Sequence, residues 1–128
     1  MNTTVIAQET AHALQQLEEA FPGRVSSEPD GLGGALVAIA GAQMPTGWPA
    51  THSSLMFVLP FNFPAIPVYP YYIGAEAAPP GALGEGLQRV DWRGRAVLQL
   101  SLRHNAWRPG LDTVVGSVLQ AMDWLQHR

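Results

Sequence analysis

Three polar side chains with complementary chemistry lie close together within residues 99–112. Ser101 carries a hydroxyl, His104 an imidazole and Asn105 an amide. A serine hydroxyl attacks a carbonyl carbon only when a base takes its proton in the transition state, and histidine titrates close to neutral pH. An asparagine amide can donate to a developing oxyanion. The grouping is compatible with acyl transfer, and also with a serine that ends a strand, a histidine bonded to a carbonyl group and an asparagine in a turn.

The composition is that of one domain with an ample core. The 128 residues are 47% hydrophobic and 13% charged, far from the composition of disordered chains. We therefore assign residues 1–128 to a single domain. The net charge is −3, and the seven cations are arginines spread along the chain, so no surface for a nucleic acid is indicated.

The sequence contains no cysteine, which removes thiol nucleophiles, disulfides and thiolate metal ligands. Its four histidines show no metal-ligand spacing, so neither a metal nor another cofactor is expected. No basic segment followed by an apolar run opens the chain, and the apolar runs end well short of a membrane span. These features favour a cytoplasmic protein without a membrane partner.

Apolar periodicity predicts a helix near the N-terminus. Its apolar positions recur every three or four residues from Ile6 to Phe21, Thr3 or Thr4 can cap it, and a Pro-Gly pair ends it. A connection rich in turn-forming residues is predicted at 28–34. Three antiparallel strands are predicted around it and after it, at residues 24–27, 35–42 and 54–59.

An irregular, proline-rich segment follows the third strand. Residues 60–72 hold four prolines among aromatic residues, and each proline removes a hydrogen-bond donor and fixes φ, so we expect an extended, packed segment. Residues 74–86 are mostly Ala, Gly and Pro, which favours a flexible excursion that could serve as a lid. The last strand is predicted at 96–102, with Ser101 on its less apolar side.

A second helix is predicted after Pro109-Gly110, with Asp112 as its cap. Its apolar stripe is formed by Val115, Val118, Leu119, Met122 and Leu125. The order of elements, with an N-terminal helix, an antiparallel strand meander, an irregular proline-rich active segment and a C-terminal helix, predicts an α+β fold.

This order and two local motifs resemble the ubiquitin-conjugating enzymes. Residues 59–68, Leu-Pro-Phe-Asn-Phe-Pro-Ala-Ile-Pro-Val, are similar to the family's hydrophobic-Pro-x-Asp/Asn-aromatic-Pro-x-x-Pro run. Residues 107–109, Trp-Arg-Pro, and the amphipathic helix after them are similar to the family's Trp-Ser-Pro and its following helix. The resemblance covers most of the chain and implies the UBC-like fold.

The chain departs from the family at the centre of its chemistry. The His-Pro-Asn signature is absent, and residues 96–98, after a glycine that matches the one before the family's catalytic cysteine, hold no nucleophile. The Ser-x-Arg-His-Asn and Trp-x-Pro-Gly-x-Asp combination resembles divergent bacterial ubiquitin-conjugating-like proteins encoded beside an activating enzyme, a ubiquitin-like protein and a protease. For such a bacterial ubiquitination-like pathway the resemblance implies oxyester intermediates and, more remotely, antiviral defence.

The resemblance implies a transferase that receives a ubiquitin-like protein from an activating enzyme and passes it to a target protein. Ser101 is the expected acyl acceptor, because it is the only serine or threonine in residues 68–110 and lies six residues before Trp107. The alternative is a catalytically inactive UBC-like variant that binds the ubiquitin-like protein or the activating enzyme without carrying an acyl group. That alternative explains the missing cysteine equally simply.

Four neighbours complete the expected site. His104 is the expected base for Ser101, and Asn105 takes the oxyanion role of the missing His-Pro-Asn asparagine. Arg103 is expected to bind the C-terminal tail of the ubiquitin-like protein. The alternative is an arginine that faces solvent and binds nothing. Trp107 is expected to pack beneath this segment and support substrate binding.

Overall fold

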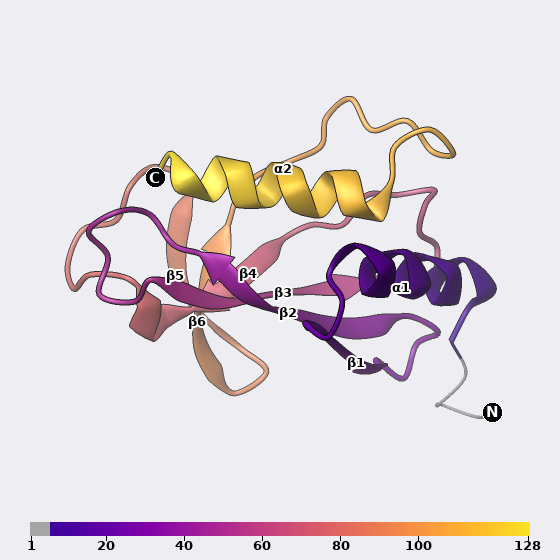
Figure 1. Ribbon diagram of the computed structural model, residues 1–128, viewed down its shortest axis with the longest axis horizontal. Helices are drawn as coiled ribbons and strands as arrows, with labels where there is room; N and C mark the ends of the chain where they lie inside the picture. The colour runs from indigo at the N-terminus through magenta and orange to yellow at the C-terminus, as the bar shows by residue number, and fades with distance from the viewer. Residues whose placement is uncertain (1–5) are drawn as a thin grey trace.

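A single antiparallel sheet with both helices on one face organises the computed structural model, which describes residues 6–128 (Figure 1). The elements are α1 (Gln8–Ala20), β1 (Val25–Pro29), β2 (Ala35–Gln43), β3 (His52–Leu59), β4 (Tyr71–Gly74), a 3-10 helix (Ala75–Ala77), β5 (Leu87–Trp92), β6 (Arg95–Leu100) and α2 (Val114–Gln126). The strands lie in the order β1-β2-β3-β4-β6-β5. The predicted α+β class, with an N-terminal and a C-terminal helix, is confirmed.

The main core lies between the sheet and the helices. Alternate side chains of the central strands face the helices, as strand geometry requires. They include Val37, Leu55, Phe57, Ile73, Leu98 and Leu100. Leu17 of α1 and Leu125 of α2 are fully buried against them. The opposite face of the sheet, which we call the helix-free face, carries a smaller cluster in which Met56, Tyr72 and Val97 are buried.

Helix α1 begins at Gln8, with Ala7 at the N-cap position and no side-chain cap. The predicted caps Thr3 and Thr4 lie outside the described residues. Thr10 is buried in the apolar stripe, and its hydroxyl donates to the Pro60 carbonyl oxygen at 3.1 Å. This bond satisfies a buried polar group and fixes the helix to the start of the proline-rich segment.

The prediction of a single strand after the proline-rich segment was wrong, because β4 and β5 also belong to the sheet. All four β4 residues are buried, so the alternation that marks a half-exposed strand is absent. Strand β5, Leu-Gln-Arg-Val-Asp-Trp, is an edge strand in which three residues are exposed and none is fully buried. It pairs with β6 through a turn at Arg93 and Gly94, which both have positive φ, as tight hairpin turns require.

The alanine-rich excursion is packed at its start. Ala77, the last residue of the 3-10 helix, and Ala78 after it are buried in the main core. Farther along, the Arg89 guanidinium donates to the carbonyl oxygens of Pro79 and Gly81 at 2.8 and 3.2 Å. These contacts hold the segment that composition alone predicts to be flexible.

Helix α2 differs from its prediction at the cap and along its buried face. Thr113, rather than Asp112, is the N-cap, and its hydroxyl oxygen accepts from the Gly116 amide at 3.0 Å. The side chain of Leu119 is 52% exposed. The buried residues are Val114, Ser117, Val118, Ala121 and Leu125. Because Ser117 and Ala121 belong to the buried stripe and Leu119 does not, the face predicted from apolar periodicity was only partly correct. Among residues 6–128, neither helix is long and apolar enough to cross a membrane.

Candidate functional site

The loop 101–113 connects β6 to α2 and is anchored by Trp107. The indole Nε1 donates to the Pro64 carbonyl oxygen at 2.8 Å, and the Trp107 ring lies 5.6 Å from the Phe63 ring. Trp107 thus packs against the proline-rich segment, and its expected part in substrate binding stays a prediction. This contact joins the two motifs, whose bonded residues are 43 positions apart in the sequence.

An ion pair closes the second half of the loop. The Arg108 guanidinium lies 2.8 Å from one Asp112 oxygen, and the Arg108 amide donates to the other at 2.8 Å. These hydrogen bonds lower the pKa of Asp112 and raise that of Arg108. Because the pair is at the surface, it shapes the loop more than it stabilises the fold. Asp112 therefore closes the loop and does not cap α2.

A chain of hydrogen bonds fixes His104 against the core. The phenol oxygen of Tyr71 lies 2.5 Å from Ser117 Oγ, which lies 2.8 Å from His104 Nε2. Tyr71 is fully buried and Ser117 is 3% exposed. Tyr71 comes from β4 and Ser117 from α2, so the loop histidine is held by two core elements.

The direction of this chain follows from the buried phenol. Burial raises the pKa of Tyr71, so the phenol keeps its hydrogen, and Ser117 is its hydrogen-bond partner among the described residues. A buried hydroxyl hydrogen without an acceptor is costly, so Tyr71 donates to Ser117 and Ser117 donates to His104 Nε2. The neutral imidazole then carries its hydrogen on Nδ1. His104 is thereby assigned as an acceptor at Nε2 and a donor at Nδ1.

The His104 imidazole favours its neutral form. Partial burial lowers its pKa, while the Gln120 side chain and the charge of Asp112 act in the opposite direction. The ring also lies 6.4 Å from the Tyr71 ring, edge to face, and 5.9 Å from the Trp107 ring. The surroundings of His104 therefore support a neutral, oriented imidazole.

A cavity of about 740 Å³ lies between the loop and α2. Among its lining residues are His104, Asn105 and Trp107 from the loop, and Ser117 and Gln120 from α2. We call it the loop cavity. It is a concave site with a tryptophan ring, an imidazole and two side-chain amides, which suits a ligand with carbonyl groups.

Two predicted site residues lie at the surface of this cavity. Arg103 lines it, and its guanidinium stacks over the Tyr69 ring at 4.2 Å, which orients the charge at an exposed position. Asn105 is exposed in a turn and also lines the cavity. Both side chains are accessible to a bound chain. Asn105 also lies in a turn, as the non-catalytic alternative expects.

Ser101 lies apart from this group. It is exposed, its amide donates to the Gly86 carbonyl oxygen at 2.9 Å, and it is not among the residues that line the loop cavity. It follows Leu100, the last residue of β6, whereas His104 bonds to Ser117 of α2. No hydrogen bond joins Ser101 to His104 among residues 6–128. The structure thus gathers four of the five predicted site residues and leaves out the serine.

Sequence reasoning missed Ser117 and Tyr71. A signal for Ser117 was available, because a serine between Val114 and Val118, on the stripe that α2 buries, requires a buried hydrogen-bond partner. Nothing in the sequence identified Tyr71 as that partner, since β4 was not predicted.

The described residues contain no group of three His, Cys, Asp or Glu side chains that could hold a metal ion. Comparison of the chain with protein-family models, curated proteins and solved structures finds no match. The fold defines an α+β protein, and function must be argued from the loop and its surroundings.

Proposed function

We propose that this chain is a ubiquitin-conjugating-enzyme-like carrier that receives the C-terminal tail of a ubiquitin-like protein from an activating enzyme and transfers it to a target protein. The observation that carries the proposal is the Trp107–Pro64 hydrogen bond, because it joins the two motifs on which the resemblance rests. The loop cavity beside Trp107 is the proposed place for the tail, with Arg103 at its rim.

Ser101 is the proposed acyl acceptor. Its Oγ attacks the activated C-terminal carbonyl carbon, the bond to the leaving group on the activating enzyme breaks, and the hydroxyl proton passes to a base. The product is a serine oxyester. A nucleophile of the target protein then attacks the ester carbonyl, the bond to Ser101 Oγ breaks, and Ser101 regains a proton.

The base role of His104 requires a rearrangement. In the structure His104 Nε2 accepts a hydrogen bond from Ser117. This atom can take the Ser101 proton only after the bond to Ser117 has broken and the Ser101 hydroxyl has taken its place. The carrier therefore requires movement of the loop 101–113 when the activating enzyme or the tail binds. Lids and loops commonly complete a catalytic site in this way.

Reconstitution with the activating enzyme, ATP and the ubiquitin-like protein tests the proposal. We expect an adduct on a denaturing gel that resists thiol reductants and is removed by hydroxylamine. Ser101→Ala should abolish it, whereas Ser27→Ala, an exposed serine on β1, should leave it unchanged. An adduct that persists in Ser101→Ala contradicts the assignment of the acceptor.

A second candidate function is binding without catalysis, as an inactive UBC-like variant. The engagement of His104 Nε2 by Ser117, with Ser101 outside the loop cavity, favours it. This candidate predicts that the ubiquitin-like protein or the activating enzyme binds without ATP, that no adduct forms, and that Ser101→Ala leaves the affinity unchanged. Calorimetric titration beside the gel assay separates the two functions.

A further inference from the structure

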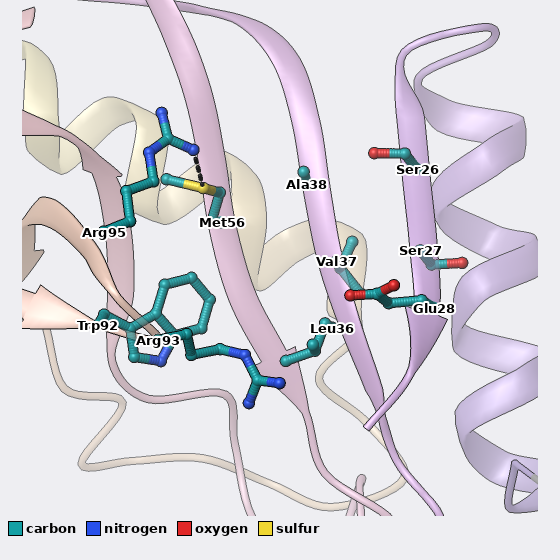
Figure 2. A pocket seen from close by; sticks show the side chains of 10 residues that line it. All are labelled: Ser26, Ser27, Glu28, Leu36, Val37, Ala38, Met56, Trp92, Arg93 and Arg95. Atoms are coloured by element: carbon teal, nitrogen blue, oxygen red, sulfur yellow. Dashed lines mark hydrogen bonds between the residues drawn. The ribbon is translucent and has the colours of Figure 1, made fainter. Parts of the chain in front are cut away.

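Two hollows in the structure hold serine side chains, and they differ in what surrounds the hydroxyl groups. A groove of about 320 Å³ on the helix-free face carries Ser26 and Ser27 of β1 on one wall (Figure 2). Within residues 6–128 its lining includes no histidine, so neither hydroxyl faces an imidazole there. The loop cavity is lined by Ser117 and His104, which are hydrogen-bonded to each other. Of the two hollows, the loop cavity is the one that brings a hydroxyl and an imidazole together.

The Ser117 hydroxyl is directed at this imidazole and not at its own helix. A serine inside a helix commonly donates to the carbonyl oxygen three or four residues before it. Ser117 instead donates to His104 Nε2 at 2.8 Å, because the buried Tyr71 phenol donates to the same Oγ at 2.5 Å. This is the geometry of a serine nucleophile and its general base, and it is present without any movement of the loop.

Tyr71 favours negative charge on Ser117 Oγ. When the Ser117 proton moves to His104, the hydrogen bond from the phenol becomes charge-assisted and therefore stronger. Burial raises the pKa of Tyr71, so the phenol stays a donor at neutral pH. Asn105 and Gln120 also line the cavity, and their amide groups can donate to the carbonyl oxygen of a bound ester.

Access to Ser117 limits the size of its substrate. The residue is 3% exposed and borders the loop cavity, so its hydroxyl is approached from that cavity. Only a compact acyl group fits such an approach. The Trp107 ring, 5.9 Å from the His104 ring, gives the cavity an apolar surface for the rest of the ester.

We propose that Ser117 and His104 form a second acyl-transfer site, which hydrolyses small carboxylic esters. Ser117 Oγ attacks the carbonyl carbon while its proton passes to His104 Nε2, and the alcohol then leaves with that proton. Water attacks the resulting acyl-serine, its proton passes to His104, and the acid departs as Ser117 Oγ regains the proton. The site requires neither Ser101 nor the activating enzyme, so it does not rest on the proposed function.

A fluorophosphonate with a short alkyl chain tests the nucleophile, because it bonds to a serine oxygen that a base activates and loses fluoride. Trypsin cuts after Arg103 and not before Pro109, so Ser117 is released on residues 104–128, where Thr113 is the other hydroxyl side chain. Mass spectrometry of the intact, folded chain after digestion should find the phosphonate on Ser117. Absence of the label from Ser117 overturns the proposal.

Two variants separate catalysis from a merely structural serine. His104→Gln keeps the bond between Tyr71 and Ser117 but removes the base, so both the labelling of Ser117 and the hydrolysis of p-nitrophenyl acetate should slow at least about 100-fold. Ser117→Ala should lose the hydrolysis to the same extent, whereas Ser27→Ala should retain it. Circular dichroism and thermal melts establish that each variant is folded. Labelling of Ser117 at the wild-type rate in His104→Gln, or unchanged hydrolysis in Ser117→Ala, overturns the proposal.

Discussion

His104 is hydrogen-bonded to Ser117, with Nε2 and Oγ 2.8 Å apart, and not to Ser101 three residues before it. Ser117 is in turn bonded to the buried phenol of Tyr71. The imidazole of the loop is therefore oriented by the core of the protein. The bond to Ser117 occupies the Nε2 atom that would have to accept a proton from Ser101.

Removing the Ser117 hydroxyl should destabilise the fold. In Ser117→Ala the buried Tyr71 phenol loses its acceptor and His104 loses its donor, so we expect a loss of about 1–3 kcal/mol in the free energy of unfolding, measured with urea. Ser27→Ala, at an exposed position, should change it by less than about 0.5 kcal/mol.

A double-mutant cycle checks that the two residues act together. Once Tyr71→Phe has removed the phenol, Ser117→Ala strands no buried hydroxyl. The cost of the double variant should therefore be smaller than the sum of the two single costs. Additive costs contradict the hydrogen-bond chain.

Stability should fall on acidification through His104. Its pKa in the folded state lies below the ordinary value of 6.5, so between these two values the unfolded chain binds more protons than the folded chain. The contribution of His104 to the free energy of unfolding therefore rises with pH in this window. It is fully present above the ordinary histidine pKa and is lost as pH falls through the pKa of the folded state.

Urea denaturation from about pH 8 to about pH 5 measures this dependence, and His104→Gln should reduce its slope. The imidazole Cε1–H resonance of His104 in an NMR titration gives the pKa directly. A pKa above the ordinary histidine value contradicts the described environment. Asp112 has a lowered pKa and contributes to a separate loss of stability at more acid pH, so it does not confuse the assignment.

Trp107→Phe should separate the indole hydrogen bond from the ring packing. The variant keeps a ring near Phe63 but leaves the Pro64 carbonyl oxygen without its donor, so we expect a loss of about 1–2 kcal/mol in urea denaturation. The matched control is Trp124→Phe, because the Trp124 indole donates no hydrogen bond within residues 6–128. An equal or smaller effect at Trp107 contradicts its anchoring role.

The cap of α2 gives a prediction that distinguishes two neighbours. Thr113→Ala removes the acceptor for the Gly116 amide and should cost about 1 kcal/mol, while Thr113→Ser should retain most of the stability. Asp112→Asn should affect the loop more than the helix, since within residues 6–128 the Asp112 side chain bonds only to Arg108. The division is contradicted if the folded Asp112→Asn variant loses more of the helical circular dichroism signal than the folded Thr113→Ala variant.

Much of the fold could be predicted because its signals are local. The apolar period of α1, the turn-forming run around Asp30 and the alternation of β2 each occur within a few residues. Asp30 accepts from the amides of Leu32 and Gly34, as such a turn requires. Strands β4 and β5 lacked local signals, because β4 is buried on both faces and β5 is an edge strand in which Gln88, Arg89 and Asp91 interrupt the apolar residues.

The residues of the site could be predicted from the sequence, but their hydrogen-bond partners could not. Residue types and spacing identified the loop that carries His104, Asn105 and Trp107. The partner of His104 could not be found this way, because Ser117 lies on another element and reaches the loop only after α2 packs on β4. Sequence proximity suggested Ser101 instead, but that serine is exposed just after β6 and does not line the loop cavity.

Peptide mapping of the trapped adduct tests the central claim most directly. Arg95 and Arg103 flank Ser101, so trypsin releases residues 96–103, a peptide in which Ser101 is the only hydroxyl side chain. After reaction with the activating enzyme, ATP and the ubiquitin-like protein, mass spectrometry should find the tail remnant as a hydroxylamine-labile ester on this peptide. An unmodified 96–103 peptide in a sample that contains the adduct would contradict the account.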